Sequence, residues 1–285
     1  MFQHKFKRAV LVSAALVWLT NFTPKADAVL INGGFDTGNL TGWTHAGFFR
    51  GSGGPNTGGP TYATFLAAQV GATATPDSNA VMSMQTSTFD GFGIAGPPVL
   101  PTSDGFLAFI SNQTATGNNT LTGSSISQTF ILPLGATSLS FNARLLNNDN
   151  PTDFATYDDF GGVALTQGST ILAQFNLDLN PASTANGHVT AGANVGGFRN
   201  STGWLTSAFN VAGLGGQTVT LTAYSVNYID NSFETRLLLD SVTVVTPEPP
   251  ALFLLALGAL LVWRPMARRV GRNSINDQTQ TGCST

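Results

Sequence analysis

Two stretches decide the fold class: residues 138–145 read SLSFNARL, and residues 217–225 read QTVTLTAYS. In each stretch, apolar residues recur at every second position, so they share one face of an extended strand. These apolar residues are Leu139, Phe141, Ala143 and Leu145 in the first stretch and Val219, Leu221 and Ala223 in the second. A period of two predicts strands with one face buried in a core.

Further short runs have the same character, and glycine, asparagine, threonine and proline separate them. They are residues 105–111, 125–132, 160–165, 170–176, 204–211 and 236–245. Gly168 and Ser169 lie between two of these runs and suit a hairpin turn. Long helical periodicity is absent. The pattern predicts an all-β domain over residues 29–246, an antiparallel β-sandwich or jelly roll.

The charge distribution excludes one class of partner. Only 9% of the 285 residues are charged. Residues 29–246 contain four arginines, twelve carboxylates and no lysine, which gives a net charge of −8. Such an acidic domain repels phosphate backbones, so we expect no nucleic-acid binding. Cys283 is the only cysteine, which excludes an intrachain disulfide and a multi-cysteine metal site.

The first 28 residues have the three parts of a secretory signal peptide. Residues 1–8 are basic, residues 9–19 are apolar, and residues 26–28 (ADA) form a small-x-small cleavage site. The apolar run is too short to span a membrane. The alternatives are an uncleaved anchor or a buried helix. We expect export, with a mature chain that begins near Val29.

The C-terminal part of the chain carries a tripeptide, a thirteen-residue apolar run and an arginine cluster, in that order. They are Pro247, Glu248 and Pro249, then residues 251–263, then Arg264, Arg268 and Arg269. A helix over the apolar run would be about 20 Å long, marginal for a hydrocarbon core of about 30 Å. The arginines should hold its C-terminal side in the cytoplasm.

This order resembles the PEP-CTERM sorting signal of Gram-negative bacteria, and the resemblance covers residues 247–269. It implies secretion through the translocon, a transient inner-membrane anchor, and processing of the tail by an exosortase that recognises the tripeptide. The protein would then reside at the cell surface or in the exopolysaccharide matrix. The chain departs from the pattern because a polar tail continues over residues 270–285. The alternative is a simple C-terminal membrane anchor.

The two ends of the β domain carry a second resemblance. Residues 32–36 (NGGFD) and 40–43 (LTGW) are similar to the opening of galactose-binding-like jelly rolls, which include several carbohydrate-binding modules. Residues 238–244 (LLDSVTV) are similar to their closing strand. The resemblance implies a jelly-roll fold over roughly residues 31–245.

In such jelly rolls a calcium ion often joins the first and last strands. The resemblance therefore implies a possible structural calcium held by the carboxylates of Asp36 and Asp240, with carbonyls near Asn32 and Phe35. The alternative is that Asp36 is a turn residue and Asp240 a polar group at the end of a strand.

Catalytic and metal-binding patterns are weak. His45 and His188 have no partner at metal-ligand spacing, so we expect both in solvated loops. Asp158 and Asp159 are adjacent, so in an extended segment they point to opposite faces and form no acid–base pair. The oxygen-rich residues 147–153 suit a solvated hairpin tip better than a loop calcium site. We expect no enzymatic activity.

Aromatic side chains stack on sugar rings, and a few polar groups then fix the orientation of the sugar. Phe48, Phe49, Trp43 and Trp204 are expected in the core. The better surface candidates for a ligand site are Tyr224, Tyr228, Asn227 and Asp230. The sequence thus predicts an exported adhesion or glycan-binding module. The alternatives are a secreted carbohydrate-active hydrolase and a structural matrix protein without a ligand.

Overall fold

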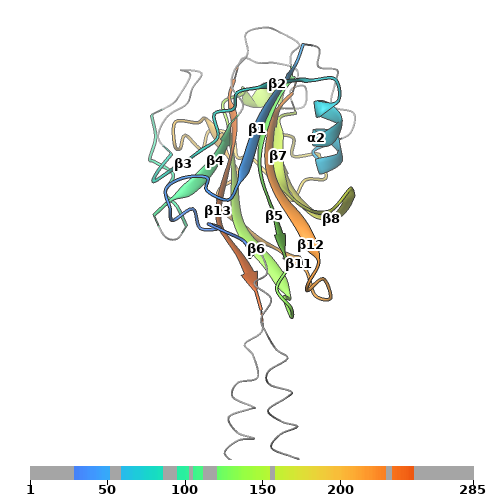
Figure 1. Ribbon diagram of the computed structural model, residues 1–285. Coiled ribbons are helices and arrows are strands. Elements are labelled where there is room, and N and C mark those ends of the chain that lie inside the picture. The colour runs from blue at the N-terminus through green and yellow to red at the C-terminus, as the bar shows by residue number, and fades with distance from the viewer. Residues whose placement is uncertain are drawn as a thin grey trace, which may run out of the picture. The chain divides into compact units, whose positions relative to one another are not determined.

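A computed structural model of the chain describes residues 29–51, 59–85, 95–102, 105–111, 121–154, 158–228 and 233–246. Strands dominate these ranges (Figure 1). The elements are β1 (Thr44–Arg50), α2 (Tyr62–Gln69), β2 (Thr73–Thr75), β3 (Ala80–Met82), β4 (Leu107–Ser111), β5 (Leu121–Ile131), β6 (Ser138–Asn147), the short 3-10 helix η1 (Pro151–Asp153), β7 (Phe160–Gln167), β8 (Thr170–Asp178), β9 (Gly187–His188), β10 (Asn200–Ser201), β11 (Leu205–Asn210), β12 (Thr218–Asn227) and β13 (Thr235–Val245).

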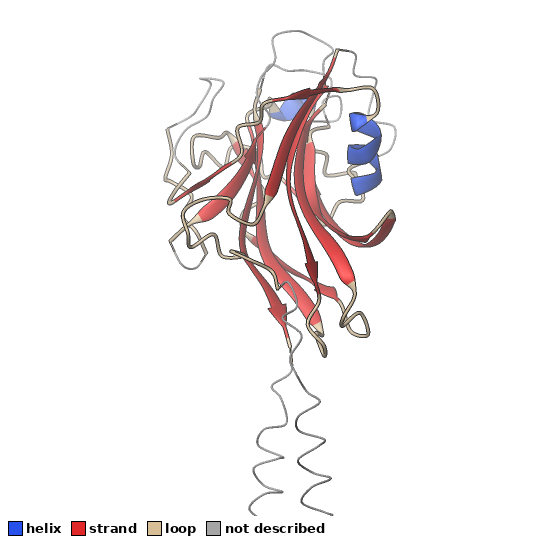
Figure 2. Ribbon diagram, in the orientation of Figure 1, coloured by secondary structure: helices blue, strands red, loops and turns tan. Residues whose placement is uncertain are grey.

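Two sheets pack face to face (Figure 2). The seven-stranded sheet has the order β2-β1-β5-β12-β7-β8-β9. The six-stranded sheet has the order β10-β6-β13-β4-β3, and β11 also pairs with β6. Strand pairs in the described ranges are antiparallel except β8 with β9, which is parallel. The predicted all-β sandwich is confirmed.

The core follows the period of two seen in the sequence. The apolar residues of 138–145 lie in β6 and those of 217–225 lie in β12, one strand in each sheet. Both sets are buried in the same cluster between the sheets. All eight predicted strands overlap observed strands, and the predicted hairpin joins β7 to β8 with Gly168 at a φ of 56°. Glycine adopts this left-handed conformation without strain.

Helix α2 and the strands β1, β2, β3, β9 and β10 were not predicted from the sequence. The Thr61 side chain accepts a hydrogen bond from the Thr64 amide and caps the first turn of α2. The helix packs on the outer face of the seven-stranded sheet (Figure 2). Phe65 stacks on Tyr224 of β12 at 4.7 Å between ring centroids, and Tyr62 lies 5.3 Å from the same ring. The sheet therefore carries apolar contacts on both faces in this region.

The predicted signal peptide (1–28), the sorting signal (247–269) and the polar tail (270–285) lie outside the described residues. Within the described ranges, no helix is both long enough and apolar enough to cross a membrane.

Candidate functional site

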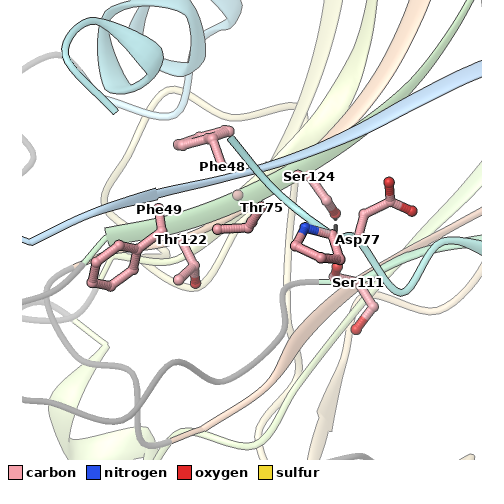
Figure 3. A pocket seen from close by; sticks show the side chains of 10 residues that line it. Phe48, Phe49, Thr75, Asp77, Ser111, Thr122 and Ser124 are labelled. Carbon is pink, nitrogen blue, oxygen red and sulfur yellow. Dashed lines mark hydrogen bonds between the residues drawn. The ribbon is translucent and has the colours of Figure 1, made fainter. Parts of the chain in front are cut away.

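A cavity of about 230 Å³ lies at the β1–β2 side of the seven-stranded sheet, next to the end of β4 in the six-stranded sheet. Its size is below the 300–1,000 Å³ of drug-sized ligand pockets, so it suits a group of about one ring. The residues that line it are Gly47, Phe48, Phe49, Thr75, Pro76, Asp77, Ser111, Thr122, Gly123 and Ser124 (Figure 3).

Strands β1 and β5 build one wall of this cavity. In their antiparallel register Gly47 faces Ser124 and Phe49 faces Thr122, so these four residues share one face of the sheet. The side chain of Phe48 points to the other face, where it joins the aromatic cluster under α2. Figure 3 shows the two phenyl rings on opposite sides of β1. The half-buried ring of Phe49 is therefore the aromatic surface available to the cavity.

Polar groups are fixed around this ring by hydrogen bonds. Asp77 Oδ1 accepts a hydrogen bond from the Asn79 amide at 3.0 Å, and its Oδ2 lies 2.9 Å from His45 Nδ1. Ser124 Oγ donates to the Ser111 carbonyl at 2.8 Å. The arrangement combines an apolar ring with hydroxyls and one carboxylate that already have defined orientations. Such a combination can hold a ring that carries hydroxyl groups.

A buried charged network lies directly behind the cavity. The Ser111 hydroxyl donates to Glu234 Oε1, and the Arg236 guanidinium donates to the same carboxylate and to Gln85 Oε1. Arg236 is 1% exposed, and its guanidinium lies 4.6 Å from the centroid of the Phe109 ring. Because the carboxylate, the guanidinium and the amide are mutually paired, the network fixes the hydroxyl of Ser111 at the cavity wall.

The residues predicted to bind a ligand lie elsewhere. Tyr224 and Asn227 are buried, so their expected surface placement is wrong. Tyr228 is 8% exposed and lines a hollow of about 410 Å³ together with Arg50 and residues of α2, so a role for it in binding stays a prediction. The Tyr224 hydroxyl donates to Asn176 Oδ1 at 2.6 Å, and burial raises the pKa of Tyr224 well above its usual value. Helix α2 covers this face, which the sequence pattern did not reveal. Asp230 lies outside the described residues.

Of the two predicted calcium-binding carboxylates, Asp240 is engaged in hydrogen bonds and Asp36 is exposed. Asp240 is buried; its Oδ2 accepts from the Thr102 amide and hydroxyl at 2.6 and 2.7 Å, and its Oδ1 accepts from the Ser241 amide at 2.6 Å. The Asp36 side chain is exposed and folds back over Gly34. Asp240 thus ties the segment before β4 to β13.

The backbone carbonyls named with this pair are also occupied. Asn32 O accepts from the Phe35 amide at 3.2 Å and from Trp43 Nε1 at 3.3 Å, and Phe35 O accepts from the Gly38 amide at 2.9 Å. Across the described ranges, no three His, Cys, Asp or Glu side chains are grouped in a way that would hold a metal ion. The Asp240 carboxylate and the two carbonyl oxygens would have to give up hydrogen bonds to bind calcium. Calcium binding by Asp36 and Asp240 stays a prediction.

A second hollow, of about 450 Å³, lies over the six-stranded sheet. Several of its polar side chains bond to each other: Ser140 Oγ lies 2.7 Å from Thr243 Oγ1, and Thr206 Oγ1 donates to Asn142 Oδ1 at 2.7 Å. Its one aromatic residue, Phe141, is buried in the core. This hollow therefore offers no aromatic face to a ligand.

Both histidines of the domain lie in strands and pair with aspartates, so their expected placement in loops is wrong, although the His45 side chain is solvent-exposed as expected. His188 Nδ1 lies 2.6 Å from Asp178 Oδ1, in the same way that His45 pairs near the cavity. Burial raises the pKa of Asp158 to about 7; the Asp178 charge adds to the shift and His188 opposes it. Burial also raises the pKa of Asp178, against opposing effects of Ser183 and His188.

Residues 147–153 begin as a buried polar cluster, so the expected solvated hairpin tip is wrong for its first part. Asn147 Nδ2 donates to Asp149 Oδ2 at 2.9 Å, to Asp159 Oδ2 at 3.2 Å and to Thr235 Oγ1 at 2.7 Å. Asp159 thus points into this cluster, while Asp158 faces His188. The predicted opposite orientation of the two adjacent aspartates agrees with these contacts.

Comparison with known proteins gives no family. No family model matches the sequence, and no curated protein matches it. Among solved structures, the chain is similar to TmCBM61 in complex with β-1,4-galactotriose, with a TM-score of 0.37 and 8% identity over 77% of this chain and 99% of that chain.

Two other similar structures have different functions. One is the K1 cleaved adhesin domain of Lys-gingipain from Porphyromonas gingivalis W83, with a TM-score of 0.35 and 11% identity over 75% of this chain and 96% of that chain. The other is the enzymatically active domain of tailspike protein 4 of bacteriophage CBA120, with a TM-score of 0.36 and 8% identity over 77% of this chain and 21% of that chain. At these scores the likenesses assign no ligand and no activity to this chain.

Proposed function

We propose that this protein is an exported glycan-binding or adhesion module that resides at the cell surface or in an exopolysaccharide matrix. Its β-sandwich binds one sugar unit of a glycan in the 230 Å³ cavity beside β1. The protein has no catalytic role in this proposal. Its C-terminal tail is a substrate of an exosortase.

The observation that carries the glycan-binding proposal is the position of the Phe49 ring. It is half-buried and borders a cavity whose other lining residues include Thr75, Thr122 and Asp77. Sugar rings have an apolar face and a rim of hydroxyls, which this combination complements. The hydrogen bonds of the surrounding groups supply the pre-organisation that reduces the entropic cost of binding.

The carboxylate count at the cavity favours binding over hydrolysis. Asp77 is the one carboxylate among the described residues that line it. A glycosidase of the common type needs two carboxyl groups, about 5 Å apart for retention or about 6.5–9.5 Å apart for inversion. Glu234 does not line the cavity; it accepts a hydrogen bond from the Ser111 hydroxyl and pairs with Arg236.

A glycan array with the full-length protein, followed by calorimetric titration of the best oligosaccharide, tests this proposal. Phe49→Ala should weaken binding at least tenfold, which corresponds to about 1.4 kcal/mol, because the stacking surface is lost. Ile171→Ala is the matched control, since Ile171 is a partly exposed apolar strand residue on β8, away from the cavity. Equal affinity of both variants and the natural protein for the oligosaccharide would show that the glycan does not bind in this cavity.

Export and sorting are supported by the sequence at the two ends of the chain. The signal-peptide pattern over 1–28 precedes the domain, and the tripeptide, apolar run and arginines over 247–269 follow it. Intact mass of the protein recovered from the envelope and the medium of its native host tests this part. We expect loss of the N-terminal 28 residues and of the chain beyond about Pro249. A mass that includes Thr285 would show a membrane anchor without exosortase processing.

A further inference from the structure

Three titratable side chains meet at one end of the seven-stranded sheet, away from the cavity. Asp178 ends β8, and in the parallel pair of β8 with β9 it is in register with His188. On the other side of β8, Phe160 of β7 is in register with Asp178, and Asp158 precedes Phe160 by two residues. Because side chains two residues apart share a face, Asp158, Asp178 and His188 lie on the same face of the sheet.

Among the described residues, this cluster holds two carboxylates and one histidine. Asp178 is 0% exposed, and the His188 ring occupies its Oδ1. Within the described part of the chain, Asp178 Oδ2 and Asp158 Oδ1 are both buried and accept no hydrogen bond of normal geometry, although the Ser183 hydroxyl is close enough to Asp178 to oppose the rise of its pKa. His188 is the basic side chain that interacts with both carboxylates there. A buried carboxylate oxygen without a hydrogen-bond partner raises the free energy of the folded state, so a ligand that binds these two oxygens would stabilise the protein.

We propose that Asp158 and Asp178 bind a divalent cation of the calcium class through Asp158 Oδ1 and Asp178 Oδ2. One water molecule could donate to both oxygens but would leave the negative charge in place, whereas a divalent cation bound by both carboxylates also neutralises the charge. Anionic oxygens select a hard cation, and calcium accepts water and backbone carbonyls in its remaining positions. Two carboxylates without a third charged ligand predict a weak site, with a Kd of about 10⁻⁴–10⁻³ M as in other extracellular modules.

His188 has a positioning role in this site. Its Nδ1 holds Asp178 Oδ1 at 2.6 Å, which fixes the carboxylate with Oδ2 free for the ion. Hydrogen bonds of this kind orient carboxylate ligands around a metal. The ion would join the start of β7 to the junction of β8 and β9, and so hold the loop between Asp178 and Gly187. The site is separate from the Asp36 and Asp240 pair and does not depend on glycan binding.

Thermal unfolding and calorimetric titration of the full-length protein with calcium chloride, after treatment with a chelator, test this proposal. At about 10 mM calcium we expect the Tm to rise by roughly 3–10 °C, given the expected Kd and the size of the domain. Asp158→Asn and Asp178→Asn should each abolish the calorimetric signal and most of the Tm rise. Asp158 is only partly buried, so its variant stays informative if Asp178→Asn fails to fold.

Two comparisons separate this site from others. Asp36→Asn should keep the part of the calcium response that Asp158→Asn removes, because Asp36 is exposed and lies on another part of the domain. Magnesium should give a smaller response than calcium, because it demands near-ideal octahedral geometry. An unchanged Tm and no heat of binding for the natural protein would overturn the proposal. A response that Asp36→Asn removes and Asp158→Asn retains would overturn it as well.

Discussion

Replacement of Glu234 by glutamine probes the buried network behind the cavity. Glu234 is 0% exposed and pairs with Arg236, which is itself buried. Glutamine keeps the shape of the side chain but removes its charge. The guanidinium is then left inside the protein without a counter-charge, a change that costs about 3–5 kcal/mol. For a domain of this size, each kcal/mol shifts the Tm by about 2–4 °C, so we expect a decrease of roughly 6–20 °C.

Circular dichroism during heating and urea unfolding would measure this loss. The double variant Glu234→Leu/Arg236→Met is the comparison for this single variant, because it removes both charges and fills the space with apolar atoms. It should recover most of the stability lost in the single variant. Asp36→Asn, a change at an exposed carboxylate, should stay within about 0.5 kcal/mol of the natural protein. A loss below about 1 kcal/mol in Glu234→Gln, or a double variant no more stable than the single one, would refute the reasoning.

Further predictions concern the packing around the site. Tyr224→Phe should cost about 1–3 kcal/mol in urea unfolding, because it leaves the buried Asn176 Oδ1 without its 2.6 Å donor. Gly123→Ala should destabilise by about 1–3 kcal/mol, because the added Cβ would lie 2.2 Å from the Phe48 ring, and it should also weaken glycan binding by moving the β1–β5 wall. Gly51→Ala, where no atom lies within 4 Å of the added Cβ, should leave both properties unchanged.

The sandwich was predictable because its strands alternate cleanly. Leu139, Phe141 and Leu145 of β6 and Val219 and Leu221 of β12 face one core, and a period of two is readable from sequence alone. Positions of the strands relative to each other were not predictable. Register depends on which strands meet across the sheet, and neighbouring strands such as β5 and β12 are far apart in the chain.

The sites were harder to predict because they depend on such long-range contacts. Tyr224 was expected at the surface because the polar residues Asn227 and Asp230 follow it closely in the sequence. Only α2, from a distant and glycine-rich part of the sequence, makes the Tyr224 face of β12 buried. Asp178 and Asp158 are twenty residues apart and meet through the β7–β8 hairpin. For Phe49 the expectation of a core residue followed the usual behaviour of phenylalanine, and the residue's place beside the cavity shows only in the register of β1 with β5.

The central claim is that a sugar ring binds in the cavity against Phe49. A crystal structure of the protein with the oligosaccharide selected by the glycan array tests it most directly. We predict a sugar ring over the Phe49 phenyl group, with its hydroxyls near Asp77 and Thr122. An oligosaccharide bound instead in the hollow over the six-stranded sheet, beside Asn142 and Thr243, would contradict the claim.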